Sequence, residues 1–215
     1  MRVNLEARAR NAELRRERTR ERLIAAALSV LADKGPDMVS VEDFVAAAQV
    51  SRGTFYNYFP TTDELIAALN DHLTAAYDKK LDAVIAGERD PAMIVALIPH
   101  EVFRSVAQDP VRAWVALKIE GSAAPRSAVL AARFEALFDW AVAQGRFHDI
   151  SRPAARTLMF GALRLAIPEM VAGRADLTDA EEIVAMLLIA YGVDRAEARR
   201  LSADAVARVR GPVAA

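Results

Sequence analysis

The sequence has 215 residues, 53% of them hydrophobic, which is enough to bury a core without help from disulfides or metals. It contains no cysteine, so a disulfide scaffold, a thiolate metal site and a cysteine nucleophile are excluded. The formal net charge is −1, and no uncharged apolar run is long enough to cross a bilayer, so we expect a cytoplasmic protein without a membrane partner.

Positive charge is concentrated at the start of the chain. Within residues 1–22, eight arginines stand against four glutamates, a local excess of four positive charges. Such a segment is typical of phosphate contact but also of a solvated helix, because pairs such as Glu13 and Arg16 have the spacing of helical ion pairs. We treat residues 1–17 as an Arg-rich N-terminal extension.

Apolar residues recur at helical spacing over residues 23–31 and again over residues 41–48, which predicts two amphipathic helices. The first is expected to end at Gly35, because a glycine commonly closes a helix. Ser40 and Asp43 form a capping signal in front of the second.

Longer helices are expected downstream. Thr61 and Glu64 open one over about 62–86, and Pro91 begins the next, which Pro99 should kink. Further helices are expected over about 110–121, 127–144, 152–172, 178–191 and 195–209. Because no segment alternates polar and apolar residues between hairpin turns, the expected fold class is all-α.

The most informative stretch is SVEDFVAAAQVSRGTFYNYF, residues 40–59, which predicts two short helices joined by a tight turn at residues 49–51. The second helix would have about eight residues and a length of roughly 12 Å, so it could lie in a major groove about 12 Å wide. Phe55 and Phe59 are expected to face inward and hold this helix to the core. Gly53 is unfavourable in a helix by about 1 kcal/mol, which close approach to a phosphate would explain.

The outward residues of this second helix have the chemistry to contact DNA. Arg52 can donate two hydrogen bonds to a guanine edge, Thr54 can meet a base or a thymine methyl, and Asn57 can read an adenine edge. Tyr56 and Tyr58 can donate hydroxyl hydrogen bonds to phosphates. The alternative, that the aromatic run is only core packing, leaves these polar side chains unexplained. The candidate DNA contacts are Ser40, Arg52, Gly53, Thr54, Tyr56, Asn57, Tyr58 and Thr62.

Residues 19–65, TRERLIAAALSVLADKG…SVEDFVAAAQVSRGTFYNYFPTTDEL, resemble the DNA-binding region of the TetR (tetracycline repressor) family, with its closing Tyr-x-Tyr/His-Phe signature. The resemblance implies a homodimer that represses transcription from a pseudo-palindromic operator, and a small-molecule effector that releases the DNA. It implies a three-helix helix-turn-helix domain at residues 18–62. A long helix joins this domain to a helical effector-binding and dimerisation domain at residues 63–210.

Two positions depart from the pattern of that family. The turn usually has a glycine where this chain has Gln49, which would then have to adopt a left-handed conformation. Thr62 stands where a lysine is common, so a phosphate contact there would weaken to a hydroxyl and a helix N-terminus. We hypothesise that the Arg-rich extension compensates for the missing lysine.

Two C-terminal segments, residues 157–167 and 183–191, are apolar nearly all round, and such helices need burial on every side. We expect a two-fold dimer that packs the helices near 152–172 and 178–191 as a four-helix bundle. The alternative is that both are core helices of a monomer.

Large side chains between residues 91 and 144 could enclose a pocket for a small apolar or aromatic effector, although such sets are more often plain core. His100 and Glu120 would be its polar anchors. The candidate pocket residues are His100, Phe103, Trp114, Glu120, Phe134 and Phe138.

The sequence gives little support to an enzymatic function. The glycines are too widely spaced for a phosphate-binding loop, and the three histidines, His72, His100 and His148, are scattered. We expect no catalytic residue, no metal site and no cofactor. A regulator that needs no ligand, or that answers to a protein partner, is the first alternative, and an all-α enzyme is the second.

Overall fold

The computed structural model describes residues 2–35, 38–120 and 124–210, and over these ranges the chain forms ten α-helices and no strand. The all-α fold class is confirmed, and most expected helices are present to within a few residues of their expected ends. The exceptions are the first helix, which already begins at Arg2, and the second helix of the helix-turn-helix, which is shorter than expected. The helices are α1 (Arg2–Lys34), α2 (Val41–Ala48), α3 (Arg52–Tyr56), α4 (Thr62–Ile85), α5 (Pro91–Gln108), α6 (Pro110–Glu120), α7 (Ala124–Ala143), α8 (Arg152–Val171), α9 (Leu177–Ala190) and α10 (Arg195–Arg210).

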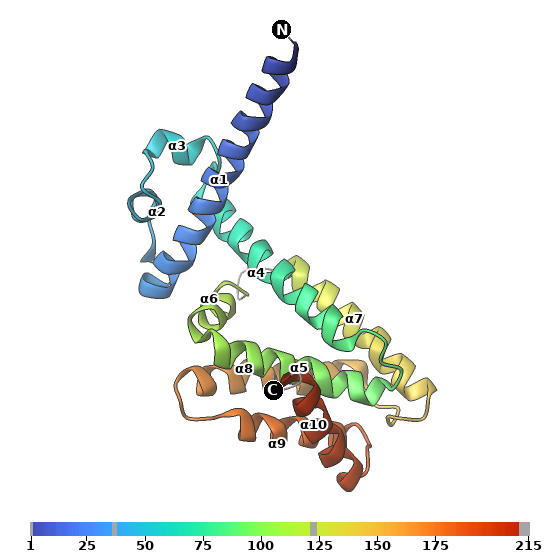
Figure 1. The fold of residues 1–215 in the computed structure, drawn as a ribbon. Coiled ribbons are helices and arrows are strands. Elements are labelled where there is room, and N and C mark those ends of the chain that lie inside the picture. The colour runs from blue at the N-terminus through green and yellow to red at the C-terminus, as the bar shows by residue number, and fades with distance from the viewer. Residues whose placement is uncertain (1, 36–37, 121–123, 211–215) are drawn as a thin grey trace, which may run out of the picture.

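The helices form a smaller and a larger part, joined by the long helix α4 (Figure 1). In the smaller part, α1 contacts α2 and α4, and α3 follows α2 at its outer end. In the larger part, α5 lies at the centre and contacts α8, α9 and α10. α6 lies between the two parts and contacts α1, α4, α5 and α8.

Local signals set several helix ends. α1 stops at Gly35, which has a φ of 75° and donates its N–H to the Leu31 carbonyl at 2.9 Å. Thr61 Oγ1 accepts a hydrogen bond from the Glu64 N–H at 3.2 Å, which is the cap expected at the start of α4. α5 runs on through Pro99, so this proline does not end the helix.

Two hydrophobic cores correspond to the two parts. The N-terminal core is built by α1, α2, α3 and the first half of α4, and its fully buried members include Leu23, Phe44, Phe55 and Leu65. Val115 and Ile119 of α6 belong to this core as well, so α6 docks the larger part onto the smaller one. The C-terminal core is contributed by α5, α7, α8, α9 and α10.

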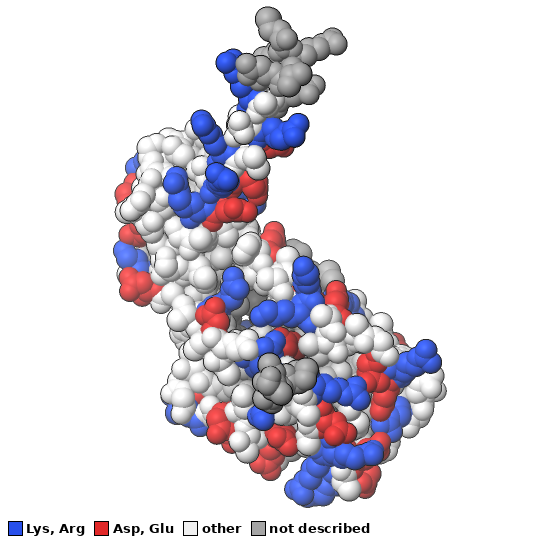
Figure 2. Space-filling model, viewed as in Figure 1, with Lys and Arg blue, Asp and Glu red and all other residues white. Residues whose placement is uncertain are grey.

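α1 is much longer than the part of it that is buried. Its first buried residue is Leu23, and from residue 7 to residue 22 every side chain is exposed except the half-buried Thr19. This segment projects past α3 (Figure 1), and basic side chains, all of them arginines, are spaced along it (Figure 2). Arg16 does not pair with Glu13, because its guanidinium lies over the ring of Tyr58 instead, 6.0 Å from the centroid.

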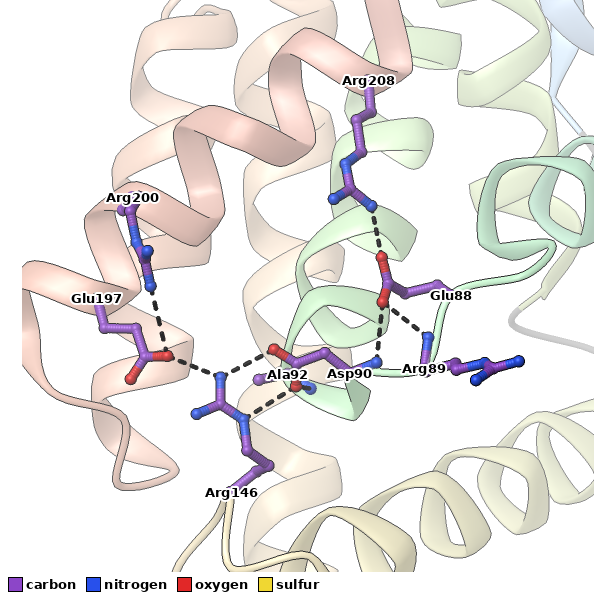
Figure 3. Close-up of polar contacts among 8 residues, drawn as sticks. All are labelled: Glu88, Arg89, Asp90, Ala92, Arg146, Glu197, Arg200 and Arg208. Atoms are coloured by element: carbon purple, nitrogen blue, oxygen red, sulfur yellow. Dashed lines mark hydrogen bonds and ion pairs between the residues drawn. The ribbon is translucent and has the colours of Figure 1, made fainter.

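An ion cluster fastens α10 to the start of α5 (Figure 3). The guanidinium of Arg146, just after α7, donates two hydrogen bonds of 2.9 Å to Asp90, the N-cap of α5. It donates a third, also of 2.9 Å, to Glu197 of α10, while Glu88 pairs with Arg208 beside it. A bidentate arginine–carboxylate contact is stronger than a single exposed ion pair, so this cluster holds α10 against the start of α5.

Candidate nucleic-acid interface

The turn between α2 and α3 has a left-handed residue at its centre. Gln49 adopts φ 53° and ψ 48°, which confirms the conformation expected of the residue in place of the usual glycine. Its N–H bonds to the Ala46 carbonyl at 3.2 Å, and the Val50 N–H bonds to the Val45 carbonyl at 3.0 Å, which is the Schellman pattern of a helix end. α2 therefore ends sharply, and the chain turns directly into α3.

The start of α2 is fixed to the end of α1. The Asp43 carboxylate accepts hydrogen bonds from the backbone N–H and the hydroxyl of Ser40, at 3.0 and 2.9 Å. It also pairs with Lys34 Nζ at 2.6 Å, and Lys34 together with the Ser40 donors lowers the pKa of Asp43 to about 2. Ser40, a candidate DNA contact, is exposed, but its hydroxyl already donates to Asp43 within the protein.

α3 is held to the N-terminal core by aromatic packing. Phe55 is fully buried, and its ring centroid lies 6.4 Å from that of Phe44 and 6.3 Å from that of Phe59. The inward placement of Phe55 and Phe59 is therefore confirmed. At the start of α3, Ser51 Oγ accepts a hydrogen bond from the Thr54 N–H at 3.0 Å. The helix is short, but a cap and a buried aromatic face fix its position.

The outward face of α3 carries polar side chains. Arg52 and Tyr56 are both exposed, and the Arg52 guanidinium lies 5.8 Å from the centroid of the Tyr56 ring. α3 has five residues, fewer than the eight expected, so Asn57 is its C-cap and Tyr58 lies beyond its end. Pro60 limits how far this helix could run, because a proline disfavours helical conformation at the residue before it, here Phe59.

Gly53 is not required by packing within the protein. A Cβ built on it would meet only Ser51 Oγ, at an ordinary contact distance of 3.9 Å, and its backbone is helical. The surface beside this glycine is thus open to a group from outside the chain.

The remaining candidate contacts lie where α3 leads into α4. Tyr58 is half-buried against the N-terminal core, with Arg16 of α1 over its ring. Arg20, one turn further along α1, lies 5.6 Å from the centroid of the Phe59 ring. Thr62 is the first residue of α4 and is half-buried. α1 therefore borders the candidate interface. The sequence suggested a phosphate contact by the Arg-rich start of the chain, but not these contacts with the rings of Tyr58 and Phe59.

Sequence reasoning also missed Glu42. Its carboxylate accepts a hydrogen bond from Arg52 Nη1 at 2.7 Å, and the two side chains are 62% and 64% exposed. An ion pair this exposed adds little stability, so its effect is to orient the arginine. The two residues lie on different helices, and only the angle between α2 and α3 brings them together, so no spacing in the sequence could have signalled the pair.

The structure separates the candidate effector residues. Phe103 of α5 and Phe134 and Phe138 of α7 are buried together in the C-terminal core. His100 of α5 is also buried and hydrogen-bonded to Ser202 of α10 at 2.9 Å. Burial lowers the pKa of His100 to about 4, with the charge of Arg210 acting in the same direction, so the ring is neutral at pH 7.

The other two candidates lie elsewhere. Trp114 of α6 is half-buried and lines a surface cleft of about 450 Å³ between α1, α6 and α8. Glu120 ends α6, and its side chain lies outside the described residues.

Tyr191, which the sequence assigned to the dimer helices, is part of the aromatic core instead. It is fully buried, and its hydroxyl donates to the Ala155 carbonyl at 2.8 Å. Its ring centroid lies 5.2 Å from those of Phe138 and Phe147. Burial raises the pKa of this hydroxyl.

Within the described part of the chain, no helix is long and apolar enough to span a membrane. No group of three or more histidine or carboxylate side chains in the same ranges could hold a metal ion.

Comparison with known proteins assigns both parts of the chain. Residues 23–69 match the family of bacterial regulatory proteins called the tetR family, and residues 90–204 match the tetracyclin repressor-like C-terminal domain. YvdT, a helix-turn-helix transcriptional regulator of Bacillus subtilis, is 30% identical over 83 residues, which are 39% of this chain and 43% of that protein. A transcriptional repressor of Mycobacterium tuberculosis is 34% identical over 58 residues, 27% of this chain and 31% of that protein. The matches thus span less than half the length of these curated relatives.

Solved structures resemble the chain over most of its length. RolR in complex with resorcinol is 30% identical, with a TM-score of 0.64, over 88% of this chain and 95% of that one. A γ-butyrolactone receptor shares the fold at 20% identity, with a TM-score of 0.68, over 89% of this chain and 98% of that one.

Proposed function

Since this chain belongs to the TetR family of bacterial regulatory proteins, we propose that it is a transcriptional repressor whose homodimer binds a pseudo-palindromic DNA operator. A small apolar or aromatic effector releases the dimer from the DNA. Residues 18–62 read the operator, and residues 63–210 bind the effector and the second subunit. The protein acts in the cytoplasm, where its operator is.

The outward face of α3 is the observation that carries this proposal. Core packing accounts for Phe55 and Phe59, but it does not account for exposed Arg52 and Tyr56 on the opposite side. The guanidinium has the geometry to bind O6 and N7 of a guanine in the major groove. The open backbone at Gly53 allows a phosphate to approach, and the N-terminus of α4 offers backbone N–H groups to the next one.

The proposed dimer surface lies on α8 and α9. Leu165 of α8 is 75% exposed, Leu158 is 43% exposed, and Met186 of α9 is 57% exposed. A second copy related by a two-fold axis would cover these side chains, as the nearly continuous apolar pattern of both helices favours. The same axis would set the two copies of α3 about 34–36 Å apart, one turn of B-DNA.

The proposed effector is a small aromatic molecule. RolR, 30% identical over 88% of this chain, has been solved with resorcinol, a small aromatic compound. In this chain the aromatic side chains around Phe103 and Phe138 are the candidates to bind such a ring, with the neutral His100 as a polar anchor. A regulator without an effector, or one controlled by a protein partner, stays the alternative, and binding of candidate phenols to the purified protein discriminates between them.

Selection of genomic DNA fragments by the purified protein tests the DNA-binding function. The test variant is Arg52→Ala/Tyr58→Phe, because phenylalanine keeps the half-buried ring of Tyr58 and removes only its hydroxyl. Arg133→Ala is the matched control, since Arg133 is exposed and forms a similar exposed ion pair, with Asp82 at 3.1 Å, but lies on α7.

We expect the wild type and Arg133→Ala to enrich one palindromic site and the double variant to lose it. Leu165→Glu should shift the wild-type dimer towards monomer in analytical ultracentrifugation and weaken binding to that site. If the folded, dimeric wild type enriches no fragment at moderate salt, the repressor proposal fails, and the enzyme alternative has to be tested.

A further inference from the structure

The exposed segment of α1, residues 7–22, has no packing reason to be helical, yet it continues α1 without a break. At 1.5 Å per residue it reaches roughly 24 Å beyond the first buried residue, Leu23. A helix of this length without burial is only marginally stable in water. The segment has no core contacts to stabilise it, so its charges are the feature that needs an explanation. We call this segment the α1 arm.

One face of the α1 arm carries arginines and no glutamate, whereas Arg10, Arg16 and Arg20 lie on or near the face of the glutamates. Arg8, Arg15, Arg18 and Arg22 follow one another at intervals of seven, three and four residues, which places them on one face of the helix. Glu13, Glu17 and Glu21 follow at intervals of four residues on another face, roughly 140° away at about 100° per residue. Ion pairs within the helix do not account for the four arginines of the first face, because only Arg18 has a glutamate, Glu21, three or four residues away.

The four arginines of this face, which we call the Arg row, differ from several arginines of the larger part. Arginines such as Arg104, Arg146 and Arg152 are paired with carboxylates. The guanidinium groups of the Arg row are exposed, and no ion pair or hydrogen bond joins them to any residue of the described ranges. The Arg row is therefore free to bind anions from outside the chain.

The C-terminal half of the α1 arm contacts the chain just after the recognition helix. Arg16 lies over the ring of Tyr58 and Arg20 over that of Phe59, directly after α3. A duplex that occupies the outward face of α3 therefore runs close to the arm. B-DNA carries about one phosphate charge per 1.7 Å of axis, so many phosphates lie within the reach of a helix roughly 24 Å long.

We propose that the Arg row of the α1 arm binds the phosphate backbone of DNA beside the site read by α3. The inference rests on the proposed DNA-binding function and adds a second, sequence-independent contact surface to it. It also accounts for Thr62, which stands where the family commonly has a lysine. A membrane surface fits less well, because Leu14 is the one large apolar side chain exposed between residues 7 and 22.

The test is the salt dependence of binding to a duplex of random sequence and to a genomic fragment that the wild type enriches. The variant replaces Arg8, Arg15, Arg18 and Arg22 by glutamine, whose helix propensity is close to that of arginine. The control replaces Glu13, Glu17 and Glu21 by glutamine on the other face. A third variant replaces the same four arginines by lysine and keeps their charge. Circular dichroism checks that all three retain the helix content of the wild type.

Between about 50 and 200 mM salt, the slope of log K against log [salt] should become shallower by about 0.9 for each phosphate that the glutamine variant no longer binds. The lysine variant should keep the wild-type slope, and the glutamate control should change it by less than the equivalent of one phosphate. An unchanged slope in the arginine-to-glutamine variant overturns the proposal. So does an equal and opposite change in the glutamate control, because that would be an effect of net charge.

The two proposals fail separately. If the arm variant binds like the wild type while Arg52→Ala/Tyr58→Phe loses its site, only the contact by the Arg row is wrong. If the wild type enriches no fragment, the repressor function is wrong, and the slope on random duplex still decides whether the arm binds DNA.

Discussion

Replacing Gln49 by glycine should stabilise the DNA-binding part, although the change removes a side chain. Gln49 joins α2 to α3 at φ 53° and ψ 48°, close to the ideal left-handed values of about +57° and +47°. In that conformation the Cβ of an L-residue lies too near the following carbonyl oxygen. The Gln49 side chain is exposed and makes no hydrogen bond to a described residue, so its removal breaks no interaction that would offset the relief of strain.

The expected gain is the difference between two effects. Relief of the left-handed conformation is worth roughly 1–2 kcal/mol for a residue with a Cβ. Glycine gives the unfolded chain more freedom, which opposes folding by about 0.4–1 kcal/mol. Gln49→Gly should therefore raise the free energy of unfolding by about 0.5–1 kcal/mol. For a chain of this size that corresponds to a rise in Tm of up to about 4 °C.

Gln49→Ala is the matched control, because alanine also lacks the polar end of glutamine but keeps the Cβ. Urea and thermal unfolding of the three proteins, followed by circular dichroism, should place Gln49→Gly above both the wild type and Gln49→Ala. If Gln49→Gly is no more stable than Gln49→Ala, the turn holds its left-handed residue without strain and the reasoning is wrong.

Three other substitutions test contacts elsewhere in the fold. Arg146→Ala should lower the free energy of unfolding by about 1–3 kcal/mol in a urea titration, because Asp90 and Glu197 lose their shared partner. Arg146→Lys should lower it by less, since lysine keeps the charge but cannot form the bidentate contact. The Asp43 carboxylate, whose pKa Lys34 helps to lower to about 2, stabilises the folded state above its ordinary pKa of 3.8 and loses that contribution as pH falls towards 2. The difference in unfolding midpoint between wild type and Asp43→Asn should therefore shrink over that range, and a constant difference would contradict the assignment. Gly192→Ala should destabilise the chain by more than about 1 kcal/mol, which is roughly the cost of a left-handed alanine. The φ of Gly192 is 105°, and the new Cβ would also lie 2.5 Å from the His148 ring. Adding His148→Ala to this variant should recover the part of the loss that is due to the clash.

Much of the fold and part of the interface could be predicted from the sequence, because they depend on neighbouring residues. The end of α1 at Gly35 and the cap of Thr61 on Glu64 each involve contacts within four residues. The left-handed conformation of Gln49 was expected from the resemblance, because the family usually has a glycine at this place in the turn. The inward side of α3 follows from the helical spacing of Phe55 and Phe59.

The contacts that shape the interface and the core depend instead on how helices cross. The orientation of Arg52 by Glu42 arises from the angle between α2 and α3, and the position of Arg16 over Tyr58 from the path of α1 past the end of α3. Tyr191 enters the aromatic core because its ring packs against Phe138 of α7 and against Phe147, whereas the sequence shows only an apolar run.

By itself, the sequence determined where most helices begin and end, apart from the start of α1 and the end of α3, and which residues of the helix-turn-helix face inward. Capping, turn chemistry and helical periodicity act over a few residues, so a short stretch of sequence contains them. Only the tertiary structure decided that Val115 and Ile119 of α6 complete the N-terminal core, and that Arg16 and Arg20 of α1 lie over the rings of Tyr58 and Phe59. Such contacts join residues distant in the chain, and the burial of apolar surface that selects them is non-directional, so no local pattern specifies the pairing.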